Sequence, residues 1–120
     1  MAVPVIAASP LSDLSVLMPS WERSLRAQNK SPRTIVAYLE GVRLLAAYLR
    51  AQGMPMNVAH LRQEHVEAFV TDQLERWRPS TACSRYRDTQ QFFKWCVAEG
   101  EIRTSPMVNM TPPAIPETSP

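Results

Sequence analysis

The feature of this sequence that most limits its fold is the spacing of its apolar residues. In four segments, at about 12–28, 32–52, 62–77 and 80–99, apolar side chains recur every three or four positions, which is the period of one face of an α-helix. No segment shows the alternation of β-branched and polar residues between turn signals that is typical of a half-buried strand. The pattern therefore predicts an all-α fold, a single bundle of four main helices without a sheet.

Capping residues predict where these helices begin and end. Ser31 is expected to cap the second helix, with Pro32 at its first position and Gly53 after its end. Ser80 or Thr81 is expected to cap the fourth helix, and Gly100 to end it. The second and fourth helices should be the longest. Leu74 is expected on the apolar face of the third helix. The predicted core draws on all four stripes: Trp21, Leu25, Ile35, Leu39, Val42, Leu49, Phe69, Val70, Phe93 and Val97.

The two ends of the chain differ from its centre. Residues 1–11 have no helical period and are expected to form a flexible leader. Five prolines fall within 106–120, and a segment so rich in proline can neither continue a helix nor form a central strand. The predicted organisation is a leader at 1–11, one helical domain at 12–105, and an extended linker at 106–120 toward a separate domain. We expect the linker to be mobile after about Val108.

Charge is distributed unevenly, although the net charge is only +2. Six basic residues and one acidic residue fall in 23–50, and five basic residues and one acidic residue fall in 76–94. Between them, 62–75 holds four acidic residues (Glu64, Glu67, Asp72 and Glu75) and one arginine. Such a chain can have a positive face while it stays nearly neutral.

The sequence lacks the residues that a disulfide, a membrane span, a metal site or a catalytic site requires. Cys83 and Cys96 would lie about 20 Å apart on one helix, too far for a disulfide, and two free thiols favour a cytoplasmic protein. No stretch approaches the roughly 18 apolar residues of a membrane span. His60 and His65 have no paired cysteines nearby and are expected at the surface or at a helix cap. Neither a metal, nor a cofactor, nor a catalytic constellation is expected.

Basic and hydroxyl residues gather where the second and fourth helices are expected to begin. Free backbone N–H groups and the positive end of the helix dipole suit phosphate oxygens there, and arginine adds bidentate contacts. Two such helix starts on one face would hold a duplex. The residues alone are equally consistent with no DNA binding, in which case the arginines are only solvated and the serines and threonines only cap the helices.

The order of these residues resembles the core-binding domain of tyrosine recombinases. Residues 31–35 (Ser-Pro-Arg-Thr-Ile), with Tyr38 one turn on, are similar to the Ser-x-x-Thr helix start of that family. Residues 92–95 (Phe-Phe-Lys-Trp), 99–102 (Glu-Gly-Glu-Ile) and 105–106 (Ser-Pro) are similar to its later helix, glycine stop and exit. The resemblance covers about 14–116 and implies two crossed helical hairpins, the SAM-like N-terminal domain of phage integrases.

The same resemblance implies a function and its partners. The domain would bind core-site double-stranded DNA through its second and fourth helices and position its own C-terminal catalytic domain, beside other recombinase protomers in a synaptic complex. The resemblance implies DNA contacts at Arg33, Thr34, Tyr38, Arg85 and Arg87. The basic and hydroxyl residues at the two helix starts add Lys30, Arg78, Thr81 and Ser84 as candidate DNA contacts. The catalytic residues of the family cannot be placed here, because neither His60 nor His65 begins a His-x-x-Arg motif. We therefore expect no strand exchange by this chain alone.

Two other functions fit parts of the sequence. A helical protein–protein interaction module would use Met54, Met56 and Trp77 as contact residues. A stand-alone helix-turn-helix regulator would need shorter helices and a tighter turn than the connection at 54–61 offers.

Overall fold

A computed structural model describes residues 12–116 and places four α-helices in them: α1 (Leu14–Ala27), α2 (Pro32–Ala51), α3 (Gln63–Arg76) and α4 (Pro79–Ala98). A short 3₁₀ helix, η2 (Val58–His60), lies between α2 and α3. Within 12–116 no strand is found beyond one isolated bridge between Asp13 and Asn57. The all-α prediction is confirmed, and α2 and α4 are the longest helices at 20 residues each. The predicted leader lies outside the described residues.

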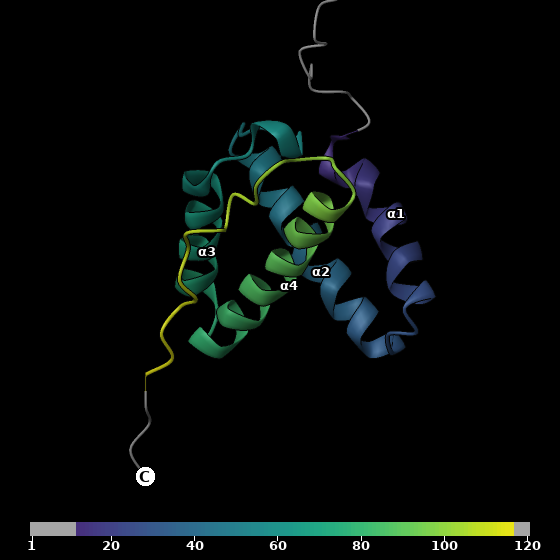
Figure 1. Cartoon of the computed structure of the whole chain (residues 1–120). Coiled ribbons are helices and arrows are strands. Elements are labelled where there is room, and N and C mark those ends of the chain that lie inside the picture. Colours follow the sequence, from purple (N-terminus) through teal and green to yellow (C-terminus); the bar gives the residue numbers. More distant parts are fainter. Residues whose placement is uncertain (1–11, 117–120) are drawn as a thin grey trace, which may run out of the picture.

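The helices form two hairpins that cross at their second members (Figure 1). α1 and α2 make one hairpin, α3 and α4 make the other, and α2 packs across α4 at the centre. The α1–α2 turn and the α3–α4 turn lie at the same end of the bundle, the lower end in Figure 1. The crossed-hairpin arrangement therefore brings the starts of α2 and α4 to one end of the molecule.

Capping chemistry explains the bounds of α2 and corrects those of α4. The Ser31 Oγ accepts a hydrogen bond from the Thr34 backbone N–H at 3.1 Å, and Gly53 follows the helix with a φ of 67°, as expected. The expected cap of α4 at Ser80 or Thr81 is wrong, because Arg78 is the N-cap and Pro79 is the first helical residue. Proline at that position loses no hydrogen bond and has its φ already set for a helix, so α4 begins earlier.

The core sits where the two hairpins cross, and nine of the ten predicted core residues are buried there, the exception being Val97. Val97 is 37% exposed and Leu74 is 40% exposed, so both predictions of an inward face were wrong. A helical stripe with a period of 3.6 residues steps by three as well as by four. After Phe93 the buried position is Cys96, and after Val70 it is Gln73.

The segment after α4 packs on the bundle. Met107 is 2% exposed and belongs to the core, and Met110 packs against that core. Figure 1 shows the chain crossing the upper end of the bundle after α4 and then running along α3. Proline content alone did not indicate this packing.

Candidate nucleic-acid interface

The start of α2 presents two cations on a tightly built turn. Asn29 adopts a left-handed conformation with a φ of 57°, which reverses the chain after α1. Lys30 and Arg33 are exposed on either side of the cap. The Ser31 hydroxyl donates to the Thr34 Oγ1 at 2.9 Å, so both hydroxyls belong to the cap. The turn therefore fixes the two cations beside the first free N–H groups of the helix.

The outward face of α4 carries a polar stripe. Ser80, Ser84, Arg87 and Lys94 are exposed and Gln91 is half-buried, and their spacing of three or four residues places them on one side of the helix. The Ser84 hydroxyl donates to the Ser80 carbonyl at 3.1 Å. Gln91 and Lys94 were missed from the sequence. Both residues could have been found from their position on α4, on the face opposite the buried stripe that contains Tyr86 and Phe93.

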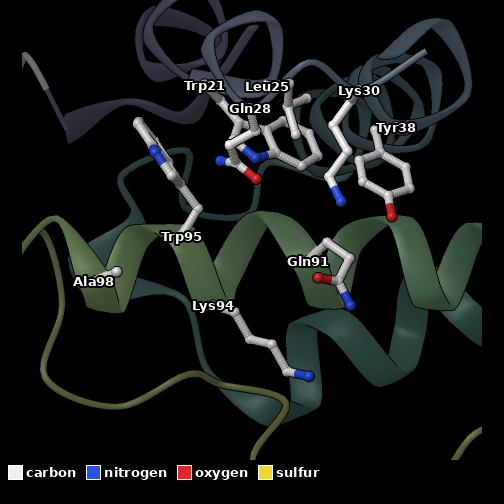
Figure 2. A pocket seen from close by; sticks show the side chains of 9 residues that line it. All are labelled: Trp21, Leu25, Gln28, Lys30, Tyr38, Gln91, Lys94, Trp95 and Ala98. Atoms are coloured by element: carbon white, nitrogen blue, oxygen red, sulfur yellow. The ribbon is translucent and has the colours of Figure 1, made fainter. Parts of the chain in front are cut away.

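A cleft of about 270 Å³ lies between α4 and the hairpin of α1 and α2. Figure 2 shows Lys30 and Tyr38 pointing across it toward α4, where Gln91 lies opposite. The Tyr38 ring stacks on Trp21, with the ring centroids 5.7 Å apart and the planes 6° from parallel. Tyr38 therefore packs its ring against Trp21. Its hydroxyl group lines the cleft, where Lys30 and Gln91 also carry hydrogen-bond donors.

Arg85 lies apart from this stripe, on the α3 side of α4. Its Nη1 donates to the Oε1 of buried Gln73 at 2.6 Å, and its guanidinium carbon lies 4.8 Å from the centroid of the Trp77 ring. Trp77 itself is 52% exposed. Arg85 therefore ties the two helices of the second hairpin together. Thr81 is half-buried, and Arg78 is exposed at the cap of α4.

Within 12–116, three arginines are paired with acidic residues and the other basic residues are not. Arg26, Arg43 and Arg76 form ion pairs with Glu22, Glu40 and Asp72 on their own helices. Within 12–116 no ion pair involves the exposed cations of the helix starts and of the α4 stripe: Lys30, Arg33, Arg78, Arg87 and Lys94. These charges are available to an anionic partner.

Residues 12–116 offer little support for a metal site, a reactive thiol or a membrane span. No group of three or more histidine, cysteine or acidic residues that could hold a metal ion occurs there. Both cysteines are buried and unpaired, and burial raises the pKa of the Cys96 thiol to about 12. His65 accepts a hydrogen bond at Nδ1 from the Arg62 backbone N–H at 2.9 Å, which confirms it as a cap residue of α3. None of the described helices is long and apolar enough to span a membrane.

Comparisons with known proteins agree with this geometry. One solved structure, described as the integrase from mycobacterium phage Brujita, matches with a TM-score of 0.71 and 23% sequence identity over 87% of this chain. The chain spans 34% of the length of that integrase. No curated protein matches the sequence. A sequence model of the phage integrase N-terminal SAM-like domain matches residues 17–100. The chain belongs to the family of phage integrase N-terminal SAM-like domains.

Proposed function

We propose that this chain is the DNA-binding module of a site-specific tyrosine recombinase. The observation that carries the proposal is a set of exposed cations without counter-ions, at the starts of α2 and α4 and along the α4 stripe. Cations at the starts of two helices, followed by an amide donor and a further cation along the outward face of α4, suit the phosphates and groove edges of a duplex. The proposed contacts are Lys30, Arg33, Arg78, Arg87, Gln91 and Lys94, with Thr34, Tyr38, Thr81 and Ser84 beside them.

The module would position chemistry that lies elsewhere. A catalytic domain after the proline-rich segment would cut and rejoin the DNA, and further protomers would bind the paired core sites in a synaptic complex. The acidic residues of α3, with Glu64 and Glu67 exposed, would face away from the duplex because phosphates repel them. Arg85 would act through the packing of the second hairpin.

Fluorescence anisotropy with a labelled core-site duplex tests the proposal. We expect a dissociation constant of about 10⁻⁴–10⁻⁶ M at physiological salt, because the binding module without a catalytic domain makes few phosphate contacts. Arg33→Ala and Arg87→Ala should each weaken binding. A lost phosphate contact should lower the slope of log affinity against log salt by about one for every sequence, whereas a lost base contact should cost about 1–3 kcal/mol at one position of the site.

Two matched variants serve as controls. Arg103→Ala removes an exposed arginine beyond the C-terminal end of α4, and it should bind like the unmodified chain. Glu64→Gln combined with Glu67→Gln should leave the affinity unchanged or raise it slightly. Equal binding by all the variants would place the DNA surface elsewhere, and binding that ignores salt would remove the electrostatic explanation.

One observation favours a second function, the binding of a protein partner. Trp77 is 52% exposed beside a cleft of about 300 Å³ that Leu44 and Tyr48 of α2 help to line. A partner that inserts an apolar side chain there would bind with little dependence on salt, and Trp77→Ala would abolish its binding. The same salt titration therefore separates the two functions.

A further inference from the structure

The chain does not leave the bundle where α4 ends. α4 ends at Ala98, and Gly100 turns the chain with a φ of 76°. The following residues cross the upper end of the bundle and then run down beside α3 toward the end where α2 and α4 begin (Figure 1). The stretch that runs along α3, residues 105–113, is called the strap below.

Two methionines anchor the strap. Met107 is 2% exposed and lies in the core, and Met110 packs against the same core. Two consecutive turns connect them, since the Val108 N–H donates to the Ser105 carbonyl at 3.2 Å and the Met110 N–H donates to the Met107 carbonyl at 3.0 Å. The Ser105 Oγ also accepts from the Met107 N–H at 3.0 Å. The anchors are thus held in place by both apolar burial and backbone hydrogen bonds.

The lower part of the strap follows the outer face of α3. Met110, Thr111 and Pro113 line a shallow cleft of about 250 Å³ together with Val70 and Leu74. Leu74 lines this cleft with Met110 and Pro113, so the strap supplies apolar neighbours to a side chain that is 40% exposed. The adjacent prolines at 112 and 113 each fix their own φ, which keeps this part of the chain extended.

We propose that the strap fixes the point at which the chain leaves the helices, on the side of α3 and at the end where α2 and α4 begin. Free movement of the chain then starts after Pro113 and not after about Val108, where the sequence predicts it. The consequence for recombination rests on the proposed function: a domain that follows the strap would start beside α3, at the end of the bundle where the candidate interface begins.

Paramagnetic relaxation in the full chain tests the route of the strap. A nitroxide is attached to Ile115→Cys, an exposed position just beyond the strap. The native thiols should escape labelling, because Cys83 and Cys96 are buried and the pKa of Cys96 is about 12. We expect strong broadening of the backbone amides around Leu74–Arg78, at the lower end of α3, and little broadening at Val58–His60, at its upper end. Uniformly weak broadening would overturn the proposal.

Two substitutions sharpen this result. Met110→Ser should remove the selective broadening while the helical circular dichroism signal stays unchanged, because the side chain anchors only the strap. Val108→Ser is the matched control, since Val108 is 63% exposed, and it should preserve the pattern. Selective broadening that survives Met110→Ser would mean that Met110 is not an anchor and would contradict the proposal.

A core-site duplex added to the labelled chain separates the two proposals. If the chain binds and the label broadens the imino protons of the duplex, the strap delivers the following residues to the DNA. If the chain binds without such broadening, the delivery is refuted although DNA binding stands. If the duplex does not bind, the proposed function fails while the broadening within the protein still reports on the strap.

Discussion

At the scale of single residues, a close contact between the two hairpins depends on a glycine. A Cβ on Gly41 of α2 would lie 2.7 Å from the Cβ of Asp88 on α4. Gly41→Ala would gain about 1 kcal/mol of helix propensity, but overpacking at a helix crossing costs about 1–3 kcal/mol. The clashing atom is next to the α4 backbone and cannot swing away, so we expect a net loss of up to about 2 kcal/mol in the free energy of unfolding measured by urea denaturation. A gain in stability would show that the crossing can widen freely.

Asp88 makes the same crossing sensitive to pH. Burial raises the pKa of its carboxyl from 3.8 to about 6, although Arg85 nearby acts in the opposite direction. Because the folded state favours the protonated form, this contribution to stability is complete below about pH 4 and is lost as the pH rises through 6. The carboxyl is only half-buried, so solvent screening limits the loss to about 1 kcal/mol. Asp88→Asn should remove this dependence from unfolding free energies measured between pH 4 and 7. An unchanged dependence would assign it to another group.

The burial of single side chains could be predicted only in part. Burial of Trp21, Leu39 or Phe69 could be predicted because each lies in the middle of an apolar stripe. Gln73 could not, because its burial depends on a hydrogen bond from Arg85, twelve positions along the chain. Asp88 likewise gave no local sign that it faces Gly41. Side chains whose partners lie on another helix require the tertiary arrangement.

At the scale of elements, α4 contributes to both the core and the candidate interface. Phe93 is fully buried, so Phe93→Ala should lower the free energy of unfolding by about 3–5 kcal/mol. Val97, one turn later, is 37% exposed, and Val97→Ala should cost under about 1 kcal/mol. Thermal or urea unfolding of the two variants measures both changes. Similar losses for both would mean that α4 is rotated relative to its described orientation.

The existence and order of the elements were predictable, whereas the end of the helical domain was not. Four apolar stripes with a proline or glycine near their ends are strong local signals, and they placed the helices within a few residues. Met107 and Met110 carry no such signal, because two methionines among prolines have no period. Their burial follows from the open face of α3, which is visible only once the hairpins have packed.

At the scale of the whole molecule, the candidate interface was predicted in part. The cations at both helix starts follow from the sequence, because capping residues mark those starts. That the two starts share one end follows only from the crossing of the hairpins. The crossing also separates Arg85, which faces α3, from Arg87, which faces outward. Gln91 and Lys94 join the interface because they line the cleft that Lys30 and Tyr38 also line.

The packing of the whole chain also predicts that it cannot form a phosphotyrosine bond with DNA. Tyr86 is 1% exposed, and its burial, together with nearby Cys83, raises its pKa. Tyr38 stacks on Trp21, and Tyr48 packs against Phe69 with the ring centroids 5.9 Å apart. A nucleophilic tyrosine must reach the phosphate and lose its proton to a neighbouring base, and all three rings are occupied by packing.

Incubation with a nicked core-site duplex that traps covalent intermediates, followed by a denaturing gel, measures this directly. We expect no covalent adduct under conditions in which a complete tyrosine recombinase forms one on its own site. The hydroxyl of Tyr38 lines the cleft beside Lys30 and Gln91 of the candidate interface, so this residue is the one to check. An adduct that disappears in Tyr38→Phe would make this residue a nucleophile and would contradict the division between a binding module and a separate catalytic domain.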